Sequence, residues 1–178
     1  MDNMTNRTNE KTKTMNFSFN ESSMNEFRRW EKKFPEDPAG RRSLVIPALW
    51  ISQWQHGYIS RDVINYVAEI TQTEPLHVWG VATFYTLFKK EKTGKFLLQF
   101  CTNITCSLMG GDQVFVNTCK KLGVKAGETT RDGMFTAVEV ECLGACGESP
   151  TLQVNEKYYT HMTDDEVEKL VADLRKMA

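Results

Sequence analysis

The sequence lacks any apolar stretch long enough to cross a membrane. Its longest uninterrupted apolar run, Leu44 to Ile51, is far shorter than the roughly 18 residues that a spanning helix needs. Charge of one sign is not in excess either, because the formal net charge is −1. A nearly neutral chain gives no electrostatic reason to expect nucleic acid or an anionic membrane as a partner. We therefore predict no nucleic-acid partner and no direct membrane insertion.

Motifs for nucleotide binding and hydrolytic catalysis are missing as well. There is no Walker loop or dinucleotide fingerprint. Histidine is scarce, and His56, His77 and His161 are scattered without the spacing of metal ligands. No nucleophile is paired with a base, and no pair of carboxylates stands out. The sequence thus predicts no substrate site and no catalytic residues of its own.

The N-terminus lacks a secretory signal, since it has no basic start followed by an apolar core and a small-residue cleavage site. Asp2, Glu10 and Glu21 argue against a mitochondrial transit peptide. We expect an interior, reducing compartment, where several cysteines indicate metal or redox chemistry more often than disulfides. The odd number of cysteines, five, suits four ligands and one further thiol better than a disulfide framework.

Four of the cysteines form two short pairs, Cys101-Thr-Asn-Ile-Thr-Cys106 and Cys142-Leu-Gly-Ala-Cys146. Each pair follows a strand-like run, 96–100 for the first and 134–140 for the second. Brought to the same end of one sheet, these thiols would form a site for a metal or an iron–sulfur cluster. Cys119 lies in a helical pattern, where a buried structural thiol is the simplest interpretation.

The two cysteine loops carry few charges. No Lys or Arg occurs between Cys101 and Gly111, and the charged residues between Val140 and Pro150 are Glu141 and Glu148. An anionic cluster would therefore be neutralised by backbone N–H groups, which loop glycines allow to approach closely. Because cations are missing and acids are near, we expect a low reduction potential.

The sequence leaves other roles for these cysteines open. A structural zinc site with four cysteines is the main alternative, although zinc sites more often separate paired cysteines by two residues. Thiol–disulfide exchange would need the Cys-x-x-Cys unit, which does not occur. A disulfide framework would need an oxidising compartment.

The chain predicts an α+β protein with two domains behind a polar tail. Residues 1–20 are predicted to be a solvated, disordered tail, because they contain too little apolar surface to offset their ordering entropy. Residues 21–90 are predicted to form a small helical bundle that serves for docking. Its Trp and Met residues are interpreted as core. Residues 91–178 are predicted to form a thioredoxin-like domain with a four-stranded mixed sheet.

Capping and turn residues locate the elements. In the bundle we expect helices over 24–34 and 41–56, separated by a turn at 35–40, then a helix capped by Ser60 and one capped by Thr73. Gly57 is predicted to end the second helix in a left-handed conformation. In the second domain we expect strands at 95–100, 134–140, 151–154 and 157–161, with helices over 107–122 and 164–177. Thr163 is predicted to cap the last helix.

Four segments of the sequence resemble a known family, the NuoE-type 2Fe–2S subunits of respiratory NADH:quinone oxidoreductase (complex I). They are Val81-Ala-Thr-Phe-Tyr85, Cys101-Thr-Asn-Ile-Thr-Cys106, Gly127-Glu-Thr-Thr-Arg-Asp-Gly133 and Val140-Glu-Cys-Leu-Gly-Ala-Cys146. The resemblance covers about residues 24–178. It implies that Cys101, Cys106, Cys142 and Cys146 bind one 2Fe–2S cluster. Ser149 is a departure, because the family commonly has alanine there.

The resemblance also implies a partner. A larger flavoprotein subunit would hold FMN and bind NADH, and the chain would exchange one electron with that flavin, beside other subunits of the peripheral arm. The location would be the cytoplasmic face of the inner membrane, or the mitochondrial matrix in a eukaryote. Related modules serve NAD-linked hydrogenases and formate dehydrogenases, so the host complex stays open. A zinc-containing interaction domain without redox function is an alternative of another class.

Overall fold

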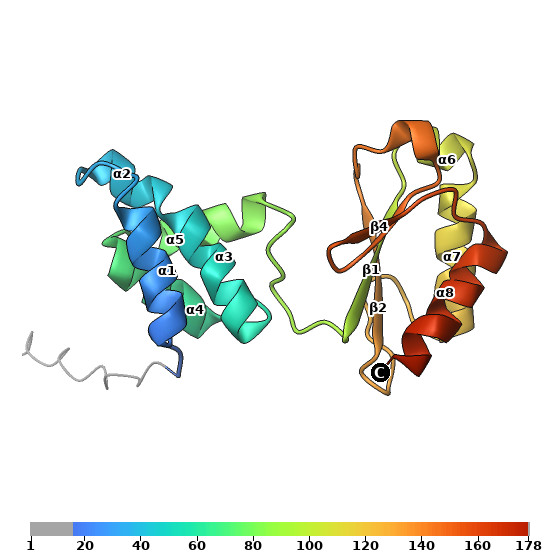
Figure 1. Ribbon diagram of the computed structural model, residues 1–178, viewed down its shortest axis with the longest axis horizontal. Helices are drawn as coiled ribbons and strands as arrows, with labels where there is room; N and C mark the ends of the chain where they lie inside the picture. The colour runs from blue at the N-terminus through green and yellow to red at the C-terminus, as the bar shows by residue number, and fades with distance from the viewer. Residues whose placement is uncertain (1–15, 178) are drawn as a thin grey trace, which may run out of the picture. The chain divides into compact units, whose positions relative to one another are not determined.

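The polypeptide divides between Lys92 and Thr93 into two compact units, and the computed structural model describes residues 16–177 (Figure 1). The first unit is helical: α1 (Glu21–Glu31), α2 (Pro38–Ser43), α3 (Val45–His56), α4 (Arg61–Thr71) and α5 (Pro75–Phe84). The second is mixed: β1 (Phe96–Cys101), α6 (Ile104–Leu108), α7 (Gly111–Leu122), β2 (Phe135–Val140), the 3₁₀ helix η1 (Cys146–Glu148), β3 (Leu152–Val154), β4 (Lys157–Tyr159) and α8 (Asp164–Lys176).

Two of the predicted helix boundaries in the first unit are confirmed. The side chain of Ser60 accepts a hydrogen bond from the N–H of Val63 at 3.3 Å and so caps α4. Gly57 ends α3 with φ +91°, a conformation that a residue with a Cβ atom rarely adopts. Local side-chain chemistry is sufficient to place both ends.

Four predictions for the bundle are wrong. The helix predicted over 24–34 is α1 at Glu21–Glu31, because Asn20 accepts from the N–H of Ser23 at 2.8 Å and caps it there. The predicted turn at 35–40 contains the start of α2, because Asp37 accepts from the N–H of Gly40 at 2.7 Å and Pro38 fits the first helical turn. The helix predicted over 41–56 is therefore two helices, α2 and α3, which meet at Leu44.

The fourth error concerns the start of α5. The residue that precedes this helix is Glu74, which makes no side-chain capping bond, and not the predicted Thr73. The hydroxyl of Thr73 instead lies 2.9 Å from that of Thr71. The two threonines thus pair with each other at the end of α4, and Pro75 occupies the first turn of α5.

Part of the predicted polar tail is packed rather than solvated. Phe17 and Phe19 are buried in the core of the helical unit, with 7% and 9% of their surface exposed. Their rings meet Tyr66 edge-on, at centroid separations of 5.4 and 5.0 Å. Two aromatic side chains bury enough apolar area to order this segment. Residues 1–15 of the predicted tail lie outside the described residues.

The second unit contains the predicted four-stranded mixed sheet, with strand order β2-β1-β3-β4. β1 pairs with β2 in parallel, and β3 pairs with both β1 and β4 in antiparallel orientation. The α+β prediction is confirmed. β1 is a central strand, and Leu98 and Phe100 on it are buried beside Phe135 and Leu152.

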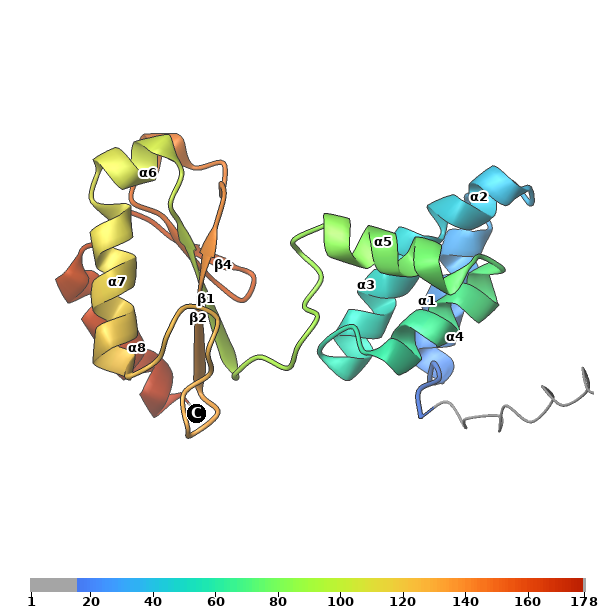
Figure 2. The same ribbon diagram turned by 180° about the vertical axis from the view of Figure 1, so that it is seen from behind.

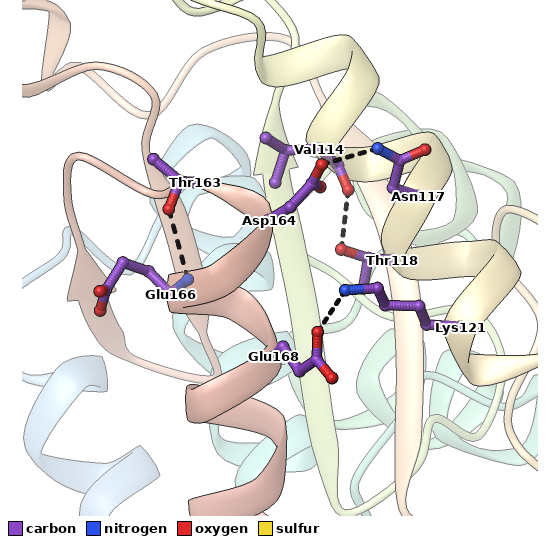
Figure 3. Close-up of polar contacts among 8 residues, drawn as sticks. All are labelled: Val114, Asn117, Thr118, Lys121, Thr163, Asp164, Glu166 and Glu168. Carbon is purple, nitrogen blue, oxygen red and sulfur yellow. Dashed lines mark hydrogen bonds and ion pairs between the residues drawn. The ribbon is translucent and has the colours of Figure 1, made fainter.

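Helices α7 and α8 lie on the same side of the sheet in both views (Figure 2). Their polar contacts are shown in Figure 3: Asn117 donates to Asp164 at 2.8 Å, and Lys121 pairs with Glu168. Thr163 accepts from the N–H of Glu166 at 3.3 Å, which confirms it as the cap of α8. These contacts fix α8 against α7, the helix that follows the first cysteine pair.

Asp132 gives the second unit a predictable response to acid. Its carboxylate accepts hydrogen bonds from the Thr130 hydroxyl and from the N–H of Met134 at 3.0 Å, and it pairs with Arg175 at 2.8 Å. These bonds lower the pKa of Asp132 from 3.8 to about 2. A carboxyl group with a lowered pKa in the folded state stabilises the fold above its unfolded pKa, and this contribution is lost as the pH falls.

Between pH 4 and pH 2 we expect the free energy of unfolding of Asp132→Asn to fall less steeply than that of the wild type. The variant has no carboxyl group at this position that must be protonated as the pH falls. Urea unfolding of wild type and variant at pH 7, 4, 3 and 2 checks this. The difference in unfolding free energy should be constant above pH 4 and should shrink below it. A difference that does not change over this range would contradict the assignment.

Candidate functional site

The two cysteine loops leave the same end of the sheet. In the parallel pair of β1 and β2, Cys101 is opposite Val140, and the N–H of Thr102 donates to the carbonyl of Val140 at 3.2 Å. Parallel strands end at the same edge of a sheet, so the chain after Cys101 and the chain after Val140 start side by side. The register therefore places both cysteine pairs at one end of the second unit.

The first cysteine pair is buried in regular structure. Cys101 is the last residue of β1, and Cys106 lies within α6, with 4% and 2% of their surface exposed. Asn103 starts α6 by accepting from the N–H of Ile104 at 2.9 Å. The predicted single helix over 107–122 is therefore wrong at its start. The observed helix α7 begins at Gly111, the short helix α6 precedes it, and Gly110, at φ +91°, separates the two.

The second pair lies in an exposed loop. Cys142 and Cys146 are both exposed. Gly144, at φ +73°, turns the loop so that its own N–H donates to Cys142 Sγ at 3.3 Å. The loop thus folds back on itself, with a backbone N–H directed at the sulfur of Cys142.

A serine joins the two loops. Cys106 Sγ lies 3.3 Å from Ser149 Oγ, and the Ser149 hydroxyl donates to the carbonyl oxygen of Cys146 at 2.9 Å. The backbone adds a second link, because the N–H of Cys101 donates to the carbonyl of Thr151 at 3.1 Å. The segment after the second pair is thus held against both cysteines of the first.

The local surroundings give the first two thiols different acidities. Burial raises the pKa of Cys101, and hydrogen bonds with the backbone of Asn103 and Leu143 only partly offset it. Burial alone would also raise the pKa of Cys106, but hydrogen bonds with the Ser149 side chain and the Thr151 backbone hold it below its usual value. Of these two buried thiols, Cys106 is therefore the one that its environment prepares for deprotonation.

Comparison with known proteins identifies the family. The family model for the thioredoxin-like [2Fe-2S] ferredoxins matches residues 30–175, which include both cysteine pairs. The chain belongs to the thioredoxin-like [2Fe-2S] ferredoxin family. The prediction from the four sequence segments is confirmed at this level, and so is the thioredoxin-like fold.

Curated relatives of this family member include E-type subunits of NADH-quinone oxidoreductase. The E-type subunit of Rickettsia conorii is 40% identical over 165 residues, which cover 92% of this chain and 98% of the relative. An E-type subunit of Rhizobium meliloti is 42% identical over 135 residues, which cover 76% and 80% of the two chains. The match is therefore to most of each relative's length rather than to a short segment.

A solved structure supports the fold alone. The chain of an NAD+-reducing [NiFe]-hydrogenase in the H2-reduced state superposes with a TM-score of 0.64 at 13% identity, over 74% of this chain. This chain spans only 22% of that hydrogenase chain. The same arrangement of elements thus also occurs inside a larger redox protein.

The donor set fits the cluster that gives the family its name. All five cysteines lie in the described part of the chain and are unpaired thiols, so four sulfurs are available from two adjacent loops. Gly111 brings the start of α7 close to the first pair: a Cβ atom there would lie 2.8 Å from the carbonyl oxygen of Cys106. The missing side chain at Gly111 thus lets the start of α7 pack directly against the backbone of the first cysteine pair.

The structure brings together some of the predicted ligands but not all. Cys101 and Cys106 interact directly, and the backbone of Leu143 reaches Cys101. Across residues 16–177, however, no three His, Cys, Asp or Glu side chains are gathered closely enough to hold a metal ion. Thiols do not attract one another, and closure of a cysteine site is coupled to metal binding. The assignment of all four cysteines as ligands therefore stays a prediction.

Cys119 behaves as predicted. Its side chain is 8% exposed and packs in the core of the second unit, within α7. Burial, followed by the charge of Glu139, raises the pKa of its thiol. A buried thiol of raised pKa is poorly reactive, which agrees with the predicted structural role of Cys119.

Two features of the site were not predicted from the sequence. Ser149 stands out there only as a departure from the resembling family, and its contact with Cys106, 43 residues away, cannot be read from spacing. Asn103 caps a helix that was not predicted, although an Asn before Ile104 is an ordinary capping signal.

Helix α5 carries an exposed apolar surface. Leu76 and Phe84 are 79% and 78% exposed, and Trp79 is 46% exposed. A cleft of about 560 Å³ runs beside them, lined by Glu74, Leu76, His77, Gly80, Val81, Phe84 and Tyr85. The interpretation of the bundle's tryptophans as core is therefore wrong for Trp54, which is 67% exposed. Exposed large apolar side chains in a group indicate an interaction surface.

Proposed function

We propose that this chain is the E-type subunit of an NADH-quinone oxidoreductase, carrying one 2Fe–2S cluster on Cys101, Cys106, Cys142 and Cys146. The observation that carries the proposal is the parallel register of Cys101 and Val140, which starts both cysteine loops at one sheet end. The similarity to E-type subunits along nearly their full length supports the choice of complex. When bound, the cluster would supply a one-electron donor and acceptor.

The chain's own groups would hold the cluster and set its electrostatics. The four cysteines would bind it as thiolates, two per iron. The N–H of Gly144 already donates to Cys142, and Gly111 lets the start of α7 approach the first pair. Cys101 and Cys106 are buried while Cys142 and Cys146 are exposed, so one side of the site is open to a partner.

The electron would be exchanged with FMN on a larger flavoprotein subunit, which would also bind NADH. The absence of a nucleotide fingerprint from this sequence supports a flavin and nicotinamide site on another chain. The exposed apolar side chains of α5, Leu76, Trp79 and Phe84, offer a docking surface for that subunit. Other subunits of the peripheral arm would complete the assembly.

The chain would reach the membrane only through its complex. Among the helices of residues 16–177, none is both long and apolar enough to cross a membrane. We propose a peripheral position at the cytoplasmic face of the inner membrane.

Anaerobic purification and spectroscopy test this function. We expect about two irons and two sulfides per chain, a red-brown colour, and the electron paramagnetic resonance (EPR) spectrum of a 2Fe–2S cluster after reduction with dithionite. A colourless protein that contains zinc would refute the cluster and favour an interaction domain. Co-purification with quinone-reducing membrane subunits supports the proposed complex. Co-purification with hydrogenase or formate dehydrogenase subunits would refute it and keep only the cluster.

A further inference from the structure

Ser149 has a side chain that touches a predicted cluster ligand across the two loops, and of the side-chain hydrogen bonds to Cys106 its effect on the pKa of that thiol is the largest. It comes after the second cysteine pair, yet its Oγ lies 3.3 Å from Sγ of Cys106 in the first pair. Cys106 is 2% exposed and Ser149 is 8% exposed. Because the contact is buried, water has little access to replace the hydroxyl if it is removed.

The direction of this hydrogen bond depends on the state of the sulfur. As a thiol, Cys106 donates its S–H to Ser149 Oγ, and the serine donates its own O–H to the carbonyl of Cys146 at 2.9 Å. A metal-bound thiolate has no proton and can only accept. The Ser149 hydroxyl can then donate either to the charged sulfur of Cys106 or to the neutral carbonyl oxygen of Cys146. Hydrogen bonds to charged groups are about twice as strong as those to neutral groups.

We propose that Ser149 is a positioning residue that donates a hydrogen bond to the Cys106 sulfur and raises the reduction potential of the cluster. The inference rests on the proposed function, since Cys106 must be a ligand. Reduction adds negative charge to the cluster, and a donor to a ligand sulfur stabilises that charge more in the reduced state than in the oxidised state. Ser149 thus raises the reduction potential, which the exposed acids Glu141 and Glu148 in the same loop are expected to lower.

The test is a redox titration of the intact, cluster-loaded chain and its Ser149→Ala variant, followed by EPR. At a fixed potential we expect the ratio of reduced to oxidised cluster to fall about tenfold in the variant, which corresponds to a shift of about 59 mV to lower potential for one electron. The amplitude of the fully reduced signal should be unchanged. An equal or higher potential in the variant would overturn the proposal.

Thr118→Ala is the matched control. Thr118 is buried like Ser149, at 3% exposed, and its hydroxyl donates to the carbonyl of Val114 within α7 rather than to sulfur. Removing it loosens the same unit without touching a ligand, so the potential should stay at the wild-type value. A shift equal to that of Ser149→Ala would mean that loosening alone moves the potential, and would overturn the proposal.

A second pair of variants covers the case in which Ser149→Ala does not hold a cluster. Ser149→Thr keeps the hydroxyl and Ser149→Val removes it, while both add similar bulk. We expect the threonine variant to have the higher potential, and equal potentials would overturn the proposal. If the wild type shows no 2Fe–2S signal, the proposed function itself fails. If it shows the signal but Ser149→Ala leaves the potential unchanged, only the role of Ser149 fails.

Discussion

Cys142→Ser is expected to lose the 2Fe–2S cluster. Cys142 is exposed and accepts the N–H of Gly144 at 3.3 Å, so serine would fit the loop but would replace a thiolate donor by a hydroxyl that iron binds poorly. Loss of an outer-shell partner already costs about 10–100-fold in metal affinity. Loss of a ligand is expected to cost more. Iron content and the EPR signal of dithionite-reduced protein measure the result.

Cys119→Ser is the control for this experiment. Cys119 is a buried thiol on α7 and is assigned no ligand role, so its variant should keep the 2Fe–2S spectrum of the wild type. Burying a hydroxyl in an apolar core should lower the stability instead. A normal cluster in Cys142→Ser, or loss of the cluster in Cys119→Ser with the fold intact, would contradict the ligand assignment.

Gly111→Ala is expected to have the second large effect, and it acts through the backbone. A Cβ atom on Gly111 would lie 2.8 Å from the carbonyl oxygen of Cys106 and 3.1 Å from that of Cys101. Both are backbone atoms of the site, so the start of α7 would have to move away from the first cysteine pair. Overpacking of this kind costs about 1–3 kcal/mol. We expect a lower urea midpoint and a lower iron content.

Gly80→Ala separates the clash from the general effect of replacing a glycine. Gly80 lies in α5, and a Cβ atom there would meet nothing within 4 Å. Alanine in a helix is favoured over glycine by about 1 kcal/mol, so this variant should be neutral or more stable. If Gly111→Ala keeps both the urea midpoint and the iron content of the wild type, the close approach of α7 to the first cysteine pair is needed neither for stability nor for cluster binding.

The features that depend on local chemistry can be predicted from the sequence. Ser60 and Thr163 cap helices as expected because a side-chain oxygen beside free N–H groups acts within a few residues. The strands that precede the two cysteine pairs lie within a residue or two of their predicted bounds, since their apolar runs are short and bounded. The mixed sheet follows from the order of strands and helices.

The errors share a physical cause, which is competition between a local signal and its surroundings. Thr73 has the chemistry of a cap, but its hydroxyl pairs with that of Thr71. Phe17 and Phe19 stand in a polar segment whose composition predicts solvation, but Tyr66 and other core side chains of the helical unit give them a place to pack. Composition averages over a segment, whereas packing acts on single side chains.

The site likewise has some features that the sequence predicts and others that it does not. The type and spacing of Cys101, Cys106, Cys142 and Cys146 are visible in the sequence, and the parallel register explains why two distant pairs leave one sheet end. The difference in burial between the pairs and the bridge through Ser149 depend on the backbone path of 145–150. That path has no periodic signature in the sequence.

The packing of Phe17 and Phe19 has a practical consequence for anyone who produces the helical unit by itself. A recombinant fragment that starts at Glu21, where regular structure begins, would omit both rings and leave the Tyr66 face of the bundle in contact with water. Such a fragment would be prone to self-association for a reason unrelated to its proposed docking role. Fragments should instead begin at or before Asn16.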